Sequence, residues 1–340
     1  MNYRNLGHSG LRVSPICLGT MMFGYRSDEA TAKRIVDRAR DAGISFIDTA
    51  DAYAKGLSEE ITGRLVAEDR DRWVLATKVG NAMGGDPHQT GLSRKWLLRA
   101  IDESLDRLGT DYLDIYYLHL PDHDTPLEET LRAMGDIIAA GKALHFGISN
   151  YRGWEHAEIV RLCDEHGVDR PVVSQPYYNA MNRMPEVEVL PVCSHYGIGV
   201  VTYSPLARGV LTGKYQPGAA PGEETRAGAK DKRMMQTEFR EDSLVHAQKI
   251  KARAEARGMT AGQFAFNWVL TNPLVSAVLA GPRTEEQWEE YLGALDHRMI
   301  PEDEDFIDSL VPRGHPSTPG YSDPVYPITG RPVTGGLLEN

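Results

Sequence analysis

Four ionisable side chains follow closely on three short apolar stretches of the chain. Asp48 and Tyr53 come after the first stretch, Lys78 ends the second, and His119 ends the third. A cation about 4 Å from a phenol favours the phenolate appreciably at an intermediate dielectric. Lys78 would therefore make Tyr53 a stronger acid, and Asp48 would hold the ammonium in place. The set predicts a proton donor for a carbonyl oxygen, with His119 orienting that carbonyl by a hydrogen bond or sharing the proton.

Each of these residues alone has an ordinary structural explanation. An Asp after a strand usually caps a helix or a turn, a Lys at a strand end is usually solvated, and a single His more often makes a structural hydrogen bond. The chemical interpretation depends on all of them reaching one space. Hydride transfer to a carbonyl also needs a hydride carrier, which side chains cannot supply, so the hypothesis requires a bound cofactor.

A closed parallel barrel is the architecture that would bring these residues together. Short apolar runs alternate with amphipathic stretches, and most runs are apolar on both faces, as a buried parallel sheet requires. The alternation predicts an α/β fold, a (β/α)8 TIM barrel, with functional residues at the carboxyl ends of its strands. The predicted strands are 16–19, 45–49, 73–78, 113–119, 143–149, 172–175, 199–203 and 277–281. The predicted helices are 28–42, a stretch around 97–108, 127–140, 154–165, 187–195 and 285–295.

We predict a single barrel domain over residues 1–340. Three segments of this domain interrupt the alternation of strands and helices. Residues 1–14 are predicted to form a hairpin that plugs the barrel floor. Residues 207–238 form a long loop rich in Gly, Lys and Arg, and a loop of that length is usually functional or mobile. The Pro- and Gly-rich tail, 312–340, either wanders or lies over a mouth of the barrel, where Tyr321 and Tyr326 would close over the pocket.

Composition narrows the classes of partner. The formal net charge of −11 disfavours nucleic acid and acidic membrane surfaces, which bind clustered Lys and Arg. No apolar run approaches the length of a membrane span, and the first residues lack a signal-peptide pattern. The three cysteines are sparse and form no C-x-x-C pair, which predicts a reducing compartment and no metal site. We therefore predict a cytoplasmic protein with a small-molecule substrate, and the sequence leaves a homo-oligomer open.

Several motifs together resemble those of aldo-keto reductases. The start of the chain resembles the branch that contains bacterial reductases and voltage-gated potassium channel β-subunits. The resemblance covers about residues 3–295. The matching segments are Tyr3-Arg4-Asn5-Leu6-Gly7, Leu18-Gly19-Thr20, Phe46-Ile47-Asp48-Thr49-Ala50-Asp51-Ala52-Tyr53, Ala76-Thr77-Lys78, Tyr117-Leu118-His119, Gly147-Ile148-Ser149-Asn150, Ser174-Gln175-Pro176-Tyr177 and Tyr203-Ser204-Pro205-Leu206-Ala207-Arg208-Gly209.

The resemblance implies a set of site residues and a nicotinamide cofactor, NADP(H). It implies a catalytic tetrad of Asp48, Tyr53, Lys78 and His119, with Tyr53 as the general acid. It also implies four groups of cofactor contacts: Ser149, Asn150 and Gln175 on the nicotinamide carboxamide; Tyr203 stacked on the nicotinamide ring; Ser204, Leu206 and Gly209 at the pyrophosphate; and Gly281, Arg283, Gln287 and Glu290 at the adenosine end.

The physics of phosphate binding favours the same end of the barrel. No G-x-G-x-x-G follows an early strand, and barrels bind phosphate at the loops after strands seven and eight. Those loops carry Arg208 and Arg283, and Thr284 can cap the next helix. Arg283 could form a charged fork on a 2′-phosphate and select NADP over NAD, or it could be an exposed surface charge. Three further cations could share that role as a clamp: Lys214, Arg226 and Lys230.

Two residues depart from the family pattern at the adenosine end. Tyr291 follows Glu290 where relatives commonly have Asn, and it cannot make the amide contacts to adenine. Pro282 removes a backbone donor that a phosphate could use.

The sequence thus predicts an NADP(H)-dependent oxidoreductase that reduces aldehyde or ketone carbonyls to alcohols. Two alternatives stay open. One is an NAD(P)-dependent alcohol or sugar dehydrogenase, and the other is a cofactor-sensing binding subunit, as the channel β-subunits are.

Overall fold

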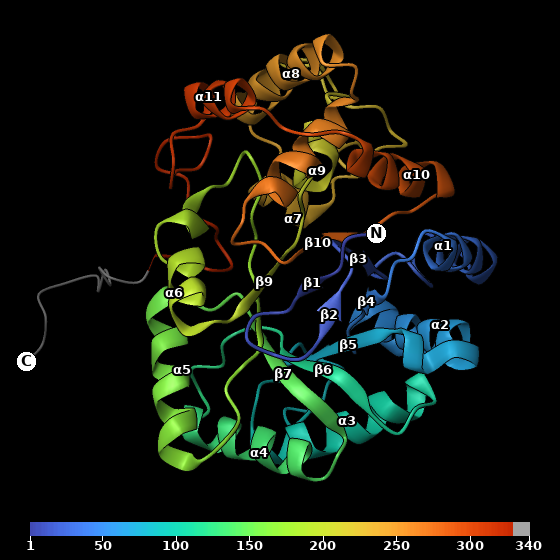
Figure 1. The fold of residues 1–340 in the computed structure, drawn as a ribbon, viewed down its shortest axis with the longest axis vertical. Helices are drawn as coiled ribbons and strands as arrows, with labels where there is room; N and C mark the ends of the chain where they lie inside the picture. Colours follow the sequence, from blue (N-terminus) through green and yellow to red (C-terminus); the bar gives the residue numbers. More distant parts are fainter. Residues whose placement is uncertain (329–340) are drawn as a thin grey trace, which may run out of the picture.

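The computed structural model describes residues 1–328, and its centre is a closed barrel of eight parallel strands in the order β10-β3-β4-β5-β6-β7-β8-β9 (Figure 1). The predicted fold class is therefore confirmed, and every predicted strand is present within two residues of its predicted bounds. The strands are β3 (Ile16–Gly19), β4 (Phe46–Asp48), β5 (Val74–Val79), β6 (Leu113–Leu118), β7 (Ala143–Ser149), β8 (Val173–Gln175), β9 (Gly199–Thr202) and β10 (Ala277–Ala280).

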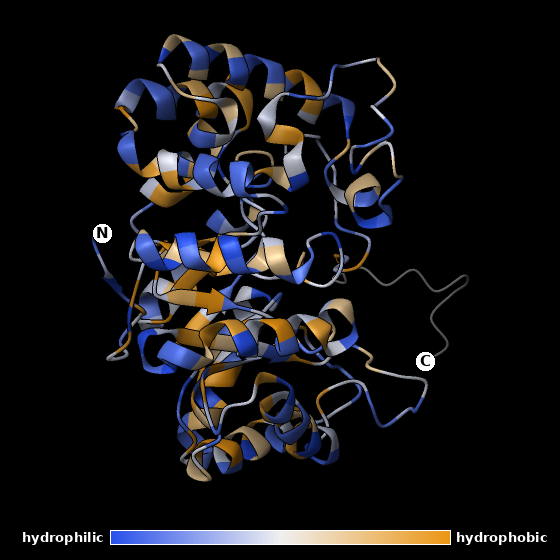
Figure 2. Cartoon of the chain, turned by 90° about the vertical axis from the view of Figure 1, so that its right-hand side faces the viewer, coloured by the Kyte–Doolittle hydropathy of each residue, from blue (hydrophilic) through white to orange (hydrophobic). Residues whose placement is uncertain are grey.

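Helices surround the barrel and turn their hydrophobic residues toward the strands (Figures 1 and 2). The side chains of Asp28 and Ser93 cap the first helix and the third by accepting backbone N–H bonds. The helices are α1 (Glu29–Asp41), α2 (Leu57–Val66), α3 (Arg94–Leu108), α4 (Leu127–Ala139), α5 (Gly153–His166), α6 (Val189–Tyr196), α7 (Lys232–Thr237), α8 (Glu241–Ala256), α9 (Ala261–Thr271), α10 (Glu285–Gly293) and α11 (Pro301–Leu310). The predicted helices correspond to α1, α3, α4, α5, α6 and α10.

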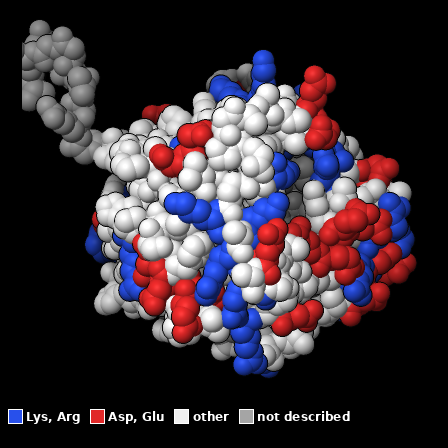
Figure 3. Space-filling model, turned by 90° about the horizontal axis from the view of Figure 1, so that it is seen from above, with Lys and Arg blue, Asp and Glu red and all other residues white. Residues whose placement is uncertain are grey.

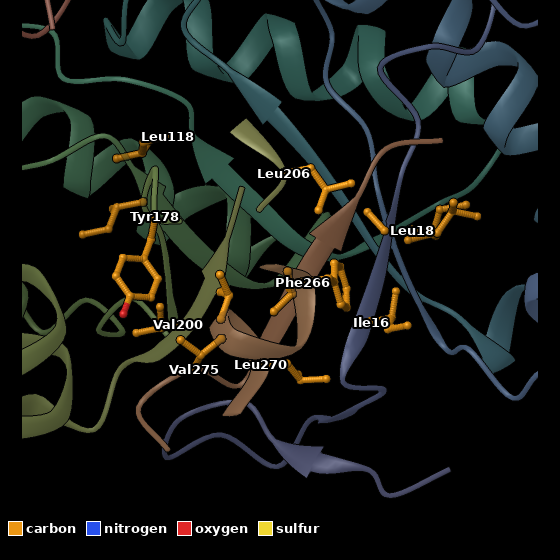
Figure 4. Close-up of a cluster of buried hydrophobic side chains, with 14 of the residues drawn as sticks. Ile16, Leu18, Leu118, Tyr178, Val200, Leu206, Phe266, Leu270 and Val275 are labelled. Atoms are coloured by element: carbon orange, nitrogen blue, oxygen red, sulfur yellow. The ribbon is translucent and has the colours of Figure 1, made fainter. Parts of the chain in front are cut away.

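Two layers of apolar side chains hold the barrel together. The outer layer joins strands to helices, as where Ile16, Leu18 and Val200 lie near Phe266 and Leu270 of α9 (Figure 4). A separate inner cluster fills the barrel itself. Strands buried on both faces explain why the sequence runs are continuously apolar rather than alternating.

A hairpin covers the floor of the barrel, as predicted. Strands β1 (Arg4–Asn5) and β2 (Arg12–Val13) pair antiparallel and lie across the end that faces the viewer in Figure 1. Leu6 and Val13 are fully buried in the inner cluster. Gly7 has a φ of +57°, and a Cβ there would lie 2.5 Å from the carbonyl oxygen of Gly197, so only glycine fits this close approach.

The segment 207–238 is less irregular than the sequence indicated. It contains a short 3-10 turn, Ala207–Thr212, and the helix α7. Residues 312–328 of the tail turn back over the barrel: the backbone N–H of Ser317 donates to the carbonyl oxygen of Met181, and Arg233 forms an ion pair with Asp323. Residues 329–340 lie outside the described part of the chain.

Within residues 1–328, no helix combines the length and apolar content needed to cross a membrane. The same residues hold no group of three or more His, Cys, Asp or Glu side chains placed to bind a metal ion. On the face shown in Figure 3, a band of Lys and Arg lies between groups of Asp and Glu.

Candidate active site

A cavity of about 680 Å³ opens at the carboxyl ends of the barrel strands. Three of the four predicted catalytic residues line it, and Lys78 is fully buried beside them. Each predicted cofactor residue lines the same cavity: Ser149, Asn150, Gln175, Tyr203, Ser204, Leu206, Arg208, Gly209, Gly281, Arg283, Gln287 and Glu290. The barrel thus brings together residues that are spread over more than 240 positions of the sequence.

Neighbouring strands place an ammonium between a carboxylate and a phenol. Asp48 of β4 pairs in register with Ala76 of β5, so Lys78 lies two residues further along on the same face of the sheet. The Lys78 ammonium donates to an Asp48 carboxylate oxygen, to the carbonyl oxygen of Thr49 at 2.7 Å, and to the Tyr53 hydroxyl at 3.5 Å. All three of the ammonium's N–H donors therefore have an acceptor.

An unusual turn sets the position of Tyr53. It begins the 3-10 turn Tyr53–Gly56, in which Ala54 and Lys55 have φ of 48° and 58°. Left-handed backbone at a non-glycine residue is strained, and surrounding structure must hold it. The Tyr53 ring meets the His119 ring edge-on, with ring centroids 6.0 Å apart, so phenol and imidazole face the same space.

The electrostatics of Tyr53 differ from the expectation of a more acidic phenol. Burial raises the pKa of Tyr53 above its ordinary value, and the Lys78 ammonium offsets only part of that rise. The reason is that the hydroxyl is removed from water, which penalises the phenolate more than one cation stabilises it. Burial also opposes the charge of Lys78, yet its pKa is raised because the Asp48 carboxylate is in contact. Tyr53 is therefore protonated at neutral pH, as a proton donor must be.

His119 is held as a neutral hydrogen-bond donor. Burial and the nearby Lys78 ammonium lower its pKa well below the ordinary value. Its Nδ1 lies 2.9 Å from the amide nitrogen of Asn81. With that amide as donor, the proton of the neutral ring resides on Nε2, and His119 lines the cavity. Sequence reasoning missed Asn81; its one signal was a position three residues after Lys78, in the loop that leaves β5.

A hydrogen-bonded wall continues from His119 along the cavity. The Asn150 amide nitrogen donates to the carbonyl oxygen of His119 at 2.8 Å, and the Asn150 oxygen accepts from the Tyr203 hydroxyl at 2.7 Å. The Ser149 hydroxyl donates to the carbonyl oxygen of Gln175, whose amide nitrogen donates to Asp48 at 3.0 Å. The Tyr203 ring is thereby fixed with one face on the cavity wall.

The loop after β9 has the shape and charge to receive a pyrophosphate. Ser204, Ala207, Arg208 and Gly209 all have positive φ, between 47° and 96°. Such turns can form anion-binding concavities, but here the N–H groups of Ala207 and Gly209 already donate to the carbonyl oxygens of Ser204 and Leu206, which leaves the Arg208 side chain as the donor for a phosphate. The Nε of Arg208 is buried and has no hydrogen-bond partner within residues 1–328. An orphaned donor in a cationic cradle fits a phosphorylated cofactor. Of the further cations predicted as a clamp, Lys214 and Arg226 line the cavity, and Lys230 is not among its lining residues.

Two arginines, Arg26 and Arg283, line the part of the cavity that the sequence predicted to hold the adenosine. The backbone N–H of Arg283 donates to the Gln287 side chain at 2.8 Å, and its carbonyl oxygen accepts from the Ser27 hydroxyl at 2.8 Å. The second contact brings the neighbouring Arg26 to the same part of the cavity. Among the described residues, neither guanidinium forms an ion pair with a carboxylate. Arg26 was not predicted, since nothing in the loop before α1 marks it.

Of the two departures from the family pattern, Pro282 is buried and is not among the lining residues of the cavity, whereas Tyr291 is. Glu290 accepts from the Thr260 hydroxyl at 2.7 Å, and Tyr291 lines the cavity while its ring packs on Phe266 at 5.2 Å. Of the two tail tyrosines, Tyr326 lines this cavity. Tyr321 instead lines a neighbouring pocket, with the Arg240 guanidinium stacked on its ring at 3.8 Å.

The closed parallel barrel, with a cavity at the carboxyl ends of its strands, defines a (β/α)8-barrel protein. The chain belongs to the aldo/keto reductase family, whose model matches residues 15–312.

Its relatives include both enzymes and channel subunits. A probable voltage-gated potassium channel subunit beta of Arabidopsis thaliana is 40% identical over 301 residues, which are 87% of this chain and 92% of that protein. An L-glyceraldehyde 3-phosphate reductase of Escherichia coli (strain K12) is 36% identical over 306 residues, 87% of this chain and 88% of the other. An uncharacterised oxidoreductase of Bacillus subtilis is 35% identical over 331 residues, 94% of this chain and 98% of the other.

Proposed function

We propose that this protein is an NADP(H)-dependent reductase that converts aldehyde or ketone carbonyls to alcohols, with Tyr53 as the general acid. The observation that carries the proposal is the position of the Tyr53 hydroxyl, which faces the cavity beside His119 and lies 3.5 Å from the Lys78 ammonium. A phenol, a cation and a neutral imidazole around one space suit a polarised C=O group.

Each of the four side chains has a separate role in the proposed reaction. The Nε2–H of His119 donates to the carbonyl oxygen and orients it. Tyr53 gives its proton to the same oxygen, and the Lys78 ammonium stabilises the phenolate that is left. A bound dihydronicotinamide would supply the hydride to the carbonyl carbon. Asp48 keeps Lys78 charged and in place, which makes its contribution indirect.

The preference for NADP over NAD is part of the proposal. Arg26 and Arg283 line the cavity together, and neither is neutralised by a carboxylate within residues 1–328. A planar guanidinium binds a phosphate monoester through paired hydrogen bonds, so two of them favour the 2′-phosphate.

Replacement of Tyr53 by Phe tests the proton donor. Tyr53→Phe removes one hydroxyl and keeps the ring, so carbonyl reduction should fall at least about 100-fold while NADPH affinity stays within about two-fold. Turnover is measured as loss of NADPH absorbance with 4-nitrobenzaldehyde, and affinity as quenching of protein fluorescence. Tyr321→Phe is the matched control, because that hydroxyl lies outside the cavity. Substantial turnover by Tyr53→Phe would mean that the proton comes from another group.

A second candidate function is a cofactor-sensing subunit of a larger assembly. It is favoured by the 40% identity to a protein named as a channel subunit. Tight NADPH binding together with single turnover only, on a panel of aldehydes and ketones, would support that role. Multiple turnover supports the reductase, and faster turnover with NAD and alcohols would support a dehydrogenase.

A further inference from the structure

Glu238, which directly follows α7, is a fully buried carboxylate with no part in the roles assigned above. One of its oxygens accepts from the Tyr177 hydroxyl. The other, Oε1, has no hydrogen-bond partner within residues 1–328 and lies 3.8 Å from Nε of Arg208, which also lacks one. An unpartnered buried carboxylate oxygen and an unpartnered guanidinium N–H are each costly. Their adjacency at the rim of the cavity therefore calls for a functional explanation.

The Tyr177 side of this cluster is connected to residues that line the cavity. The Tyr177 ring stacks on the Tyr203 ring, with centroids 5.6 Å apart and planes inclined by 28°. The Tyr203 hydroxyl donates to Asn150, and Asn150 donates to the carbonyl oxygen of His119. A continuous set of packed and hydrogen-bonded groups thus runs from Glu238 to the backbone of His119.

We propose that Glu238 is a positioning residue that joins the Arg208 guanidinium to the Tyr177–Tyr203 stack. This inference rests on the proposed function, in which Arg208 contacts the cofactor pyrophosphate and Tyr203 the nicotinamide ring. The carboxylate contacts the Arg208 guanidinium through one oxygen and the Tyr177 hydroxyl through the other. It thereby fixes the position of the pyrophosphate site relative to that of the nicotinamide site. The long Arg208 contact leaves that guanidinium with N–H groups free for a phosphate.

The direction in which NADPH affinity changes when Glu238 is neutralised separates a positioning role from a simple charge effect. If Glu238 acted only through its charge, its neutralisation would tighten NADPH binding, because a negative charge near a bound anion repels it. If Glu238 positions Arg208, neutralisation weakens binding, because the guanidinium loses its partner and its orientation.

The test compares Glu238→Gln, Arg208→Ala and the double variant in the full-length chain. Each single change should raise the NADPH Kd about 10-fold, and the double variant should be within about two-fold of Arg208→Ala, since both changes remove one interaction. The NADPH Kd is measured by fluorescence quenching, and thermal unfolding is followed in parallel. Glu241→Gln, an exposed acid at the start of α8, is the matched control and should bind NADPH like the unaltered chain.

The possible outcomes are distinct. Tighter or unchanged NADPH binding by Glu238→Gln, or additive losses in the double variant, would overturn the inference and leave the proposed function standing. Failure of the unaltered chain to bind NADPH would overturn both. If Glu238→Gln does not fold, Tyr177→Phe tests the contact between Glu238 and the Tyr177 hydroxyl. In that variant kcat should fall about 10-fold while the NADPH Kd stays within about two-fold. An unchanged kcat would contradict the positioning role.

Discussion

Arg26 and Arg283 line the cavity from different loops, and their contributions to the proposed preference for NADP can be measured separately. Ser27 and Gln287 bond the backbone of Arg283 on two sides, whereas the Arg26 backbone N–H donates once, to the carbonyl oxygen of Met22 at 3.0 Å. Arg283 is thus the better anchored of the two. Arg283→Ala should weaken NADPH binding about 10- to 100-fold, which is the loss of affinity expected when one hydrogen-bonded ion pair is removed. The same variant should change NADH binding less than two-fold.

The controls for this prediction are two further arginine variants. Arg26→Ala should cause a smaller loss of NADPH affinity in the same direction. Arg12→Ala, on the floor hairpin at the opposite end of the barrel, should cause none. Equal losses of NADPH and NADH affinity in Arg283→Ala would remove that residue from the 2′-phosphate.

Asp51 makes stability depend on pH near neutrality. Its Oδ1 accepts from the backbone N–H of Ala52 at 2.6 Å, but its Oδ2 is buried without a partner in the described chain. Burial and the neighbouring Glu59 carboxylate raise the pKa of Asp51 to about 8. The folded state therefore keeps a proton that the unfolded chain releases near pH 4. This contribution to stability is fully present below about pH 4 and is lost as pH rises through about 8.

Asp51→Asn isolates that contribution. The amide cannot titrate, so the variant should lose less stability than the unaltered chain when pH rises from 5 to 8, by on the order of 1 kcal/mol per pH unit at most. Thermal unfolding of both proteins at pH 5, 6, 7 and 8 measures the difference. Parallel curves for the two proteins would show that Asp51 is ionised in the folded state.

Helices α2 and α3 approach each other closely enough to require a glycine. A Cβ on Gly63 would lie 2.1 Å from the carbonyl oxygen of Leu108, a backbone atom that cannot move aside like a side chain. Gly63→Ala should therefore destabilise the fold by about 1–3 kcal/mol and lower the Tm. Gly10→Ala, at a position with no atom within 4 Å, is the matched control and should leave Tm nearly unchanged. Equal stability of the two variants would mean that α2 shifts without cost.

The same elements show how far the sequence predicts the fold. Strands were predictable because burial on both faces leaves an uninterrupted apolar run, and α1 and α3 because one face alone is apolar. Helix α9 carries apolar and small residues on all sides and is buried almost throughout, so it lacks the amphipathic period that marks a surface helix. Helix α2 begins at Leu57, after the left-handed residues Ala54, Lys55 and Gly56, which no helix signal anticipates.

Site residues at the ends of strands were predictable from the sequence pattern, whereas some residues on loops were not. Asp48, Lys78 and His119 end apolar runs, so their shared rim follows from the barrel alone. Asn81 and Arg26 reach the cavity from loops, through contacts with residues distant in the sequence: Asn81 bonds to the His119 ring, and Ser27 beside Arg26 donates to Arg283. No local pattern encodes a contact of that kind.

At the scale of the whole molecule, two electrostatic effects oppose each other on an anionic cofactor. The chain has a formal net charge of −11, which repels an anion at long range. The lining of the cavity nevertheless carries more cations than carboxylates: Arg26, Arg208, Lys214, Arg226, Arg233 and Arg283 against Asp48, Glu224 and Glu290. Close cations act over a few ångströms within a partly desolvated cavity, whereas the surface charges are screened by salt and by each other. We expect the local cations to determine equilibrium affinity.

A salt titration of cofactor affinity tests which effect dominates. The screening length falls from about 10 Å at 0.1 M to about 3 Å at 1 M salt, so attraction to the cavity cations should weaken over that range. The NADPH Kd should rise at least about 10-fold, and the NADH Kd should rise less because NADH lacks the 2′-phosphate. Arg283→Ala should bring the NADPH slope close to that of NADH. Affinity that instead increases with salt would mean that the net negative charge of the molecule, rather than the cationic cavity, governs cofactor binding.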